Sequence, residues 1–229
     1  STAAELYDRG QAVCAALNQE IAGFIESAFR VDSKLELEFE IVYDRFYLPT
    51  VRHAVGTEAR GRAKGYAGRP IGRDGQPAAI DVKGMEAIRS DWTPVAQEFQ
   101  RELLTLLFAD ASPDEIHGCV ARCVGGVRDG TLDDRLVYSR RLRKGVGAYT
   151  KSKPPHVQAA ELLPPEDRDG DIAYVITTAG PQPIAAMTAA IDHEHYVDRQ
   201  IRPIAEPICE VAGVDPSALF EPTDQLSLF

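Results

Sequence analysis

The 229 residues carry a formal charge of −10, with 26% charged and 44% hydrophobic side chains. This composition supports one large or two small folded domains and excludes an intrinsically disordered chain. No apolar run approaches the ~20 residues of a membrane-spanning helix, and the first residues lack the layout of a signal peptide. The four cysteines fit reduced thiols better than a disulfide framework. We therefore expect a cytoplasmic protein with no membrane partner.

The first part of the chain changes from a helical to a β pattern. Apolar residues recur at three- and four-residue steps over residues 2–30, which predicts one long amphipathic helix. The segment KLELEFEIVY, residues 34–43, alternates apolar and polar residues and predicts a strand with one buried face. The Gly- and Arg-rich residues 57–72 and the segment 74–84 each predict a turn that leads into a further strand.

From Thr93 onward the pattern becomes mainly helical. Thr93 is a suitable N-cap and Pro94 occupies the first turn, where its missing N–H costs nothing. The segment SPDE, Ser112 to Glu115, is a capping box that predicts the start of a second helix ending near Gly125.

The remaining elements are also expected to be mostly helical. Thr131 is a possible cap for a third helix that runs through residues 131–142, and residues 171–181 predict a short β segment. A closing helix is expected to be kinked by Pro203 and Pro207. The predicted fold class is therefore α+β, with a boundary near residues 84–92.

Positive charges are concentrated in one part of this acidic chain. Between Asp134 and Glu161 there is no acidic residue. The same stretch contains seven positive side chains and three interleaved rings, namely Arg135, Arg140, Arg141, Arg143, Lys144, Lys151 and Lys153 with Tyr138, Tyr149 and His156. Arginine and lysine bind phosphates and aromatic rings contact sugars and bases, which predicts a nucleic-acid-binding surface. A solvated helix face explains the same charges equally well.

A second basic cluster lies in the segment EARGRAKGYAG. Arg60, Arg62 and Lys64 precede Tyr66, which stands between small residues that let another backbone approach closely. A plain hairpin turn explains this composition equally well.

Other candidate sites do not add up to a catalytic or metal centre. Cys119 and Cys123 stand four residues apart without a partner pair, so we expect buried structural cysteines rather than a zinc site. His193 and His195 are two residues apart and point to different sides of a helix. The sequence contains neither a Gly-rich phosphate loop nor a Gly-x-Ser-x-Gly turn. We therefore assign no catalytic residue, no metal and no cofactor to this chain.

Taken in order, several segments resemble the C-terminal part of family B DNA polymerases, in particular the bacterial DNA polymerase II type. They are LELEFEIVYDRFYLPTVR, KGYAG, KGMEAIRSDWTPVAQEFQRELL, LVYSRRLRKGVGAYTKSKPPHVQAA and QLSLF. The resemblance implies that residues 1–84 are the end of a palm subdomain, with a long helix and antiparallel strands. Residues 85–220 are then a mostly helical thumb that holds the primer–template duplex.

The resemblance also implies roles for single residues. The family's Lys-Lys-Arg-Tyr motif, which follows the minor groove, reads Ala-Lys-Gly-Tyr here, so only Lys64 and Tyr66 match it. The other implied DNA contacts are Lys83, Arg89, Arg140, Arg141, Arg143, Lys144, Lys153 and His156. Trp92 is expected in the core. Glu40 lies near the position of a carboxylate close to the family's active site, although a solvated strand explains it equally well.

The family's catalytic aspartates lie in two motifs that this sequence does not contain. Phosphoryl transfer by two metal ions needs carboxylates that hold both ions. The resemblance therefore implies a fragment of a DNA-directed DNA polymerase, a nucleotidyltransferase associated with the nucleoid, that polymerises nothing alone. Mg²⁺ is expected only for the full polymerase. The alternative is a complete, non-catalytic DNA-binding or clamp-adaptor protein.

The last residues, 221–229, are expected to be a flexible tail. Gln225, Leu226, Leu228 and Phe229 resemble the Gln-Leu-x-Leu-Phe peptide that bacterial polymerases insert into the sliding clamp. A glutamine side chain orients such a peptide through hydrogen bonds, and the three apolar side chains fill a pocket. Packing of these side chains on the chain's own core is the alternative.

Overall fold

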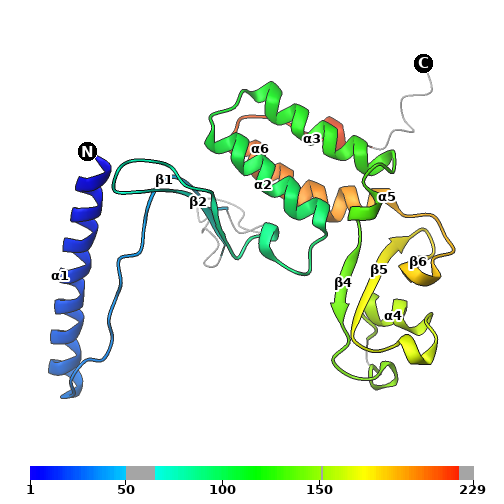
Figure 1. Cartoon of the computed structure of the whole chain (residues 1–229), viewed down its shortest axis with the longest axis horizontal. Coiled ribbons are helices and arrows are strands. Elements are labelled where there is room, and N and C mark those ends of the chain that lie inside the picture. The colour runs from blue at the N-terminus through cyan, green and yellow to red at the C-terminus, as the bar shows by residue number, and fades with distance from the viewer. Residues whose placement is uncertain (50–64, 151, 222–229) are drawn as a thin grey trace. The chain divides into compact units, whose positions relative to one another are not determined.

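The computed structural model describes residues 1–49, 65–150 and 152–221 (Figure 1). They form two compact units. The first contains residues 1–48 and 66–82, and the second consists chiefly of the described residues from 83 onward. Among these described segments, no helix is both long enough and apolar enough to cross a membrane.

Helix α1 (Ala3–Phe29) opens the first unit and confirms the helix predicted over residues 2–30. The Thr2 hydroxyl accepts the Glu5 backbone N–H at 3.3 Å, and the Glu5 carboxylate accepts the Thr2 backbone N–H at 2.9 Å. This capping box satisfies two of the free N–H groups at the start of the helix. The helix ends at Arg30, which adopts a left-handed conformation with φ of 54°.

The apolar stripe of α1 is present in the sequence but is not buried within this unit. No residue of the helix is buried, and the exposed fractions of Val13, Leu17 and Phe24 are 54%, 47% and 64%. The 3.6-residue period thus correctly predicted a helix, but the expected packing of its stripe is not seen in the described residues.

The segment before the first strand differs from its prediction. Residues 34–41 form no strand, and β1 begins only at Val42. The Asn18 side chain instead accepts the Leu37 N–H at 2.7 Å and donates to the Leu37 carbonyl at 2.9 Å. The Phe39 ring meets the Tyr7 ring edge-on at 5.6 Å. The strand prediction was wrong here because α1 side chains supply the partners that a neighbouring strand would otherwise provide.

The strands of the first sheet follow the predicted order. Strands β1 (Val42–Tyr47), β2 (Tyr66–Ile71) and β3 (Asp81–Lys83) form a sheet in the order β1-β2-β3. Strands β1 and β2 are antiparallel, with an irregularity between Tyr43 and Arg45. The strand predicted within residues 57–72 is confirmed as β2, and the strand predicted within residues 74–84 is confirmed as β3.

Three helices form the core of the second unit. Helices α2 (Pro94–Phe108) and α3 (Pro113–Arg128) begin at the predicted caps, Thr93 and Ser112. They pack side by side with α6 (Arg202–Val211) (Figure 1). Their buried side chains include Leu103, Leu104, Ile116, Val120, Ile204 and Ile208.

The helix predicted through residues 131–142 is wrong. A single 3-10 turn (Asp133–Arg135) leads into strand β4 (Tyr138–Arg141), which pairs with β5 (Asp171–Thr177). The Thr131 hydroxyl caps no helix and donates instead to the Asp129 carboxylate at 2.7 Å. Pairing with a distant segment overrides the local helical pattern here. The second unit consequently contains a small sheet in addition to its helices.

The second sheet has the order β4-β5-β6, and its last strand is β6 (Gly180–Pro183). The β segment predicted over residues 171–181 is confirmed by β5. Helix α4 (Pro155–Glu161) packs on this sheet through Val157, Ala159 and Ala160.

The closing helix is confirmed but is interrupted. Helix α5 (His193–Tyr196) continues through a π-helical turn (Val197–Ile201) into α6, which contains Pro207. Tyr196 is fully buried and its ring stacks on Tyr138 of β4 at 5.6 Å. This contact joins the second sheet to the helices of the same unit.

Candidate nucleic-acid interface

An open cleft of about 520 Å³ lies between the start of α2 and strand β4 in the second unit. One wall consists of the loop before α2 and its first turn, and the other consists of β4, the residues after it and the start of β5. The lining residues are Ser90, Trp92, Pro94, Gln97, Val137, Ser139, Arg140, Arg141, Arg143 and Asp171. Three guanidinium groups against one lining carboxylate make this cleft electropositive on an otherwise acidic chain.

The β4 wall presents its arginines from a firmly held strand. Leu142 is buried, and its N–H donates to the Gly170 carbonyl at 2.9 Å. Arg140 and Arg141 are exposed and belong to β4, whereas Arg143 follows it. Within the described part of the chain, the guanidinium groups of Arg141 and Arg143 form no ion pair. They are therefore available to an external anion.

The predicted residue Arg89 and the acid Asp91 flank the lining residue Ser90 of the opposite wall and are not themselves lining residues. The Arg89 guanidinium donates two hydrogen bonds to the Asp91 carboxylate, at 2.9 and 2.6 Å. Arg140 approaches the same carboxylate at 3.7 Å. The two Arg89 hydrogen bonds lower the pKa of the Asp91 carboxyl below its usual range, and burial partly opposes this shift.

Buried side chains fix the loop that carries this pair. The Gln97 side-chain amide donates to the carbonyls of Arg89 and Trp92, at 2.8 and 3.2 Å. The Thr93 backbone N–H donates to the buried Gln200 side chain at 3.0 Å. Trp92 is half-buried and lines the cleft, which differs from its expected place in the core.

Three further predicted contacts lie outside the lining of the cleft. The Lys144 ammonium sits 4.5 Å from the centre of the Tyr149 ring, a cation–π arrangement. Lys153 forms an ion pair with Glu161 at 2.5 Å. His156 is half-buried in α4, and its pKa is lowered first by burial and then by the nearby Arg140. These charges do not share one helix face, because Arg140 and Arg141 lie on β4, Arg143 and Lys144 follow it, and Lys153 precedes α4.

Other predicted residues belong to the first unit or its border. Tyr66 opens β2 and packs against the Phe46 ring at 5.3 Å. Glu40 is exposed in the irregular segment before β1, and Lys83 is exposed at the end of β3. Lys64 lies outside the described residues.

The tail residues Gln225, Leu226, Leu228 and Phe229 also lie outside the described residues.

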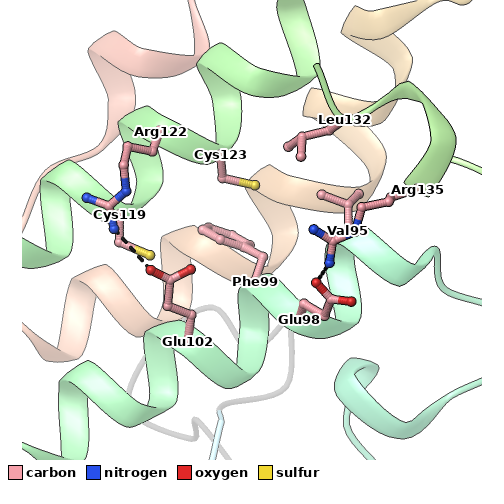
Figure 2. Close-up of a pocket in the computed structure, with 9 residues that line it drawn as sticks. All are labelled: Val95, Glu98, Phe99, Glu102, Cys119, Arg122, Cys123, Leu132 and Arg135. Carbon is pink, nitrogen blue, oxygen red and sulfur yellow. Dashed lines mark hydrogen bonds and ion pairs between the residues drawn. The ribbon is translucent and has the colours of Figure 1, made fainter. Parts of the chain in front are cut away.

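A second, smaller pocket of about 200 Å³ lies between α2 and α3 (Figure 2). Phe99, Cys119 and Cys123 line it, and burial raises the pKa of both thiols to about 12. Ion pairs border it, Glu102 with Arg122 at 3.0 Å and Glu98 with Arg135. Arg135 belongs to the basic stretch of the sequence, but its guanidinium group forms an ion pair with Glu98 at this pocket.

The two predicted histidines contact different residues. His193 contacts the Asp133 carboxylate at 2.7 Å, whereas the His195 ring lies 3.5 Å from the Tyr138 hydroxyl. Among the residues that the structure describes, no three histidine, cysteine or acidic side chains gather as a metal site would require.

The sequence reasoning missed Asp171, which lines the cleft, and Asp91, which lies in sequence between the lining residues Ser90 and Trp92. The segment Arg-Ser-Asp, residues 89–91, contained a usable signal, because its two charges are close enough to pair locally. No local pattern in the sequence indicated Asp171, because only the pairing of β4 with β5 places it next to Arg141 at the cleft.

A wide, arginine-lined cleft has the chemistry of a surface that binds a polyanion. The chain belongs to DNA polymerase family B, whose sequence model matches residues 9–207.

Curated relatives agree with this membership. The chain is 38% identical to DNA polymerase II of Escherichia coli (strain K12) over 210 residues, 87% of this chain and 25% of that protein. It is 34% identical to DNA polymerase 2 of Aeropyrum pernix over 199 residues, 80% of this chain and 23% of that protein. It is 27% identical to a Methanocaldococcus jannaschii DNA polymerase over 91% of this chain and 12% of the relative. The chain thus spans about a quarter of the length of the first two relatives.

Proposed function

We propose that this chain is the palm-end and thumb region of a DNA-directed DNA polymerase of the DNA polymerase II type. Its cleft holds phosphates of the primer–template duplex. The observation that carries the proposal is the gathering of Arg140, Arg141 and Arg143 on one wall of an open cleft in a member of this family.

Arginines suit this task for a physical reason. A planar guanidinium group donates paired hydrogen bonds to phosphate oxygens and keeps its charge at every physiological pH. Contacts with phosphates carry no sequence information. A polymerase that must hold any duplex sequence therefore benefits from a grip of this kind, and Arg141 and Arg143 are free to supply it.

The chemical step is proposed to depend on residues elsewhere in a full polymerase. The described residues hold no carboxylate cluster for a metal ion, and the chain matches only 25% of the length of the E. coli relative. The two Mg²⁺ ions of the reaction would supply charge stabilisation at that other site. In this proposal the present chain positions the duplex and does not polymerise alone. The family match over residues 9–207 does not favour a separate, complete adaptor protein.

We further propose that residues 225–229 tether the polymerase to a sliding clamp. The support is the sequence Gln-Leu-Ser-Leu-Phe itself, which combines one orienting amide with three apolar side chains.

The cleft assignment is tested by reversing charges on its free wall. The double variant Arg141→Glu/Arg143→Glu should bind a short labelled duplex about tenfold or more weakly, because two phosphate contacts become repulsive. Fluorescence anisotropy measures the affinity over about 50 to 200 mM salt, where loss of two contacts should also flatten the salt dependence.

The control variant is Arg9→Glu/Lys34→Glu, which changes the net charge equally on exposed positions of the first unit. An equal effect of the two double variants, or no effect of the first, would show that the cleft does not hold the duplex.

A further inference from the structure

The Asp91 carboxylate lies between two arginines at the edge of the cleft. It accepts both hydrogen bonds from Arg89, at 2.9 and 2.6 Å, and its nearer oxygen lies 3.7 Å from the Arg140 guanidinium. A carboxylate and a phosphate offer arginine the same pair of oxygen acceptors. Asp91 therefore occupies the type of position that a bound phosphate would occupy.

The surroundings keep this carboxylate at the cleft and leave it reachable. Gln97 fixes the carbonyls on both sides of Asp91, at residues Arg89 and Trp92. The side chain of Asp91 remains 28% exposed, whereas those of Arg89 and Arg140 are 45% and 46% exposed. Arg89 and Arg140 are thus partly exposed to solvent, but the Asp91 carboxylate already lies beside both guanidinium groups.

We propose that Asp91 acts as an internal competitor of duplex phosphates and thereby sets how tightly the cleft holds DNA. This inference rests on the proposed function of the cleft. Asp91 repels an approaching phosphate and keeps Arg89 engaged, so the free grip consists mainly of Arg141 and Arg143. A weak, sequence-independent grip suits a duplex that must advance after each addition.

A purely structural role for Asp91 gives the opposite expectation. If the carboxylate serves only to orient Arg89 and Arg140 toward DNA, its removal leaves both guanidinium groups less ordered and duplex binding weaker. The sign of the change in affinity therefore separates the two roles.

The test compares Asp91→Asn with the unmodified 229-residue chain by anisotropy of a labelled duplex. Binding should become about three- to tenfold tighter at about 50 mM salt, because the released Arg89 gains a phosphate contact. The slope of log K against log salt should steepen by about 0.9, the value for one further phosphate.

Two control variants isolate the effect. Glu102→Gln removes one negative charge from the exposed Glu102–Arg122 pair at the smaller pocket and should change affinity less than about twofold. Asp91→Glu keeps the charge and should bind like the unmodified chain. Equal tightening by Asp91→Asn and either control would overturn the inference, as would unchanged or weaker binding by Asp91→Asn.

A substitute variant and the comparison with Arg141→Glu/Arg143→Glu complete the test. If Asp91→Asn does not fold, Asp91→Ser takes its place with the same expectations, since serine also removes the charge and keeps a small polar side chain. If Arg141→Glu/Arg143→Glu leaves affinity unchanged, the proposed function itself fails. If that variant weakens binding but Asp91→Asn does not tighten it, only the role of Asp91 is overturned.

Discussion

The Tyr196 hydroxyl accepts a hydrogen bond from the Ile176 backbone N–H at 2.7 Å, at the point where α5 meets the second sheet. The Tyr196 ring is fully buried and stacks on Tyr138 of the neighbouring strand at 5.6 Å. One side chain thus connects the sheet that carries the cleft arginines with the helical core of the same unit.

Replacement of Tyr196 by phenylalanine should destabilise the second unit. The ring keeps its packing, but the partly buried Ile176 N–H loses its acceptor, which costs about 1 kcal/mol. Urea unfolding followed by circular dichroism measures the change. Tyr149→Phe is the matched control, because Tyr149 is only half-buried and no hydrogen bond of its hydroxyl is described. Equal stability of Tyr196→Phe and the unmodified chain would contradict this role.

Removal of the Asn18 side chain should release the segment that precedes β1. Asn18 bonds both backbone groups of Leu37, and Asn18→Ala leaves the Leu37 N–H to water, whereas the Leu37 carbonyl keeps the Cys14 thiol as a donor at 3.1 Å. We expect faster amide hydrogen exchange in residues 34–41, with little change in the second unit. Gln19→Ala, an exposed neighbour on the same helix, is the control. Unchanged exchange at Leu37 in Asn18→Ala would show that other contacts hold this segment.

Secondary structure was predictable from the sequence where its hydrogen-bond partners lie close together in the chain. Helix starts at Thr93 and Ser112 were predictable because a cap and its N–H partner lie within a few residues of each other. Strand β4 was not, because its pairing with β5 depends on residues far along the chain. Residues 34–41 have a strand pattern, but Asn18 of α1 supplies their hydrogen-bond partners, and alternation alone does not reveal this.

The candidate site was also predictable only in part from the sequence. The excess of arginine between Asp134 and Glu161 was visible in the sequence and led to the cleft wall. The engagement of Lys153 with Glu161 and of Arg135 with Glu98 was not visible, since it depends on how the elements pack. Charge density thus located the cleft, whereas tertiary contacts determined which of its charges are free.

The buried thiols should make stability fall in alkaline solution. Burial raises the pKa of Cys119 to about 12 and that of Cys209 to about 11, from an ordinary value of 9.0. The unfolded chain therefore loses these protons at lower pH than the folded chain, and unfolding becomes easier as pH rises above about 9. Thermal unfolding of Cys209→Ala and of the unmodified chain between pH 8 and pH 10 measures this, with a smaller decline expected for the variant.

Thiol labelling at neutral pH gives an independent check of the same burial. Cys119 and Cys209 are buried, so they should react with a thiol reagent only as the chain unfolds. Cys14 and Cys123 are partly exposed and should account for early labelling, which the double variant Cys14→Ser/Cys123→Ser removes. Rapid labelling of Cys119 in the folded chain would contradict the packing described between α2 and α3.

Deletion of residues 225–229 should abolish capture of the chain by a bacterial sliding clamp and leave thermal stability unchanged. The reason is that Leu226, Leu228 and Phe229 are proposed to fill a pocket of the clamp rather than the chain's own core. Clamp pull-down and a melting curve on the same samples measure the two effects. The control Ser227→Ala changes a residue between the apolar anchors and should retain binding. A large fall in melting temperature on deletion would instead assign these side chains to the core, and retained capture would place the clamp contact elsewhere.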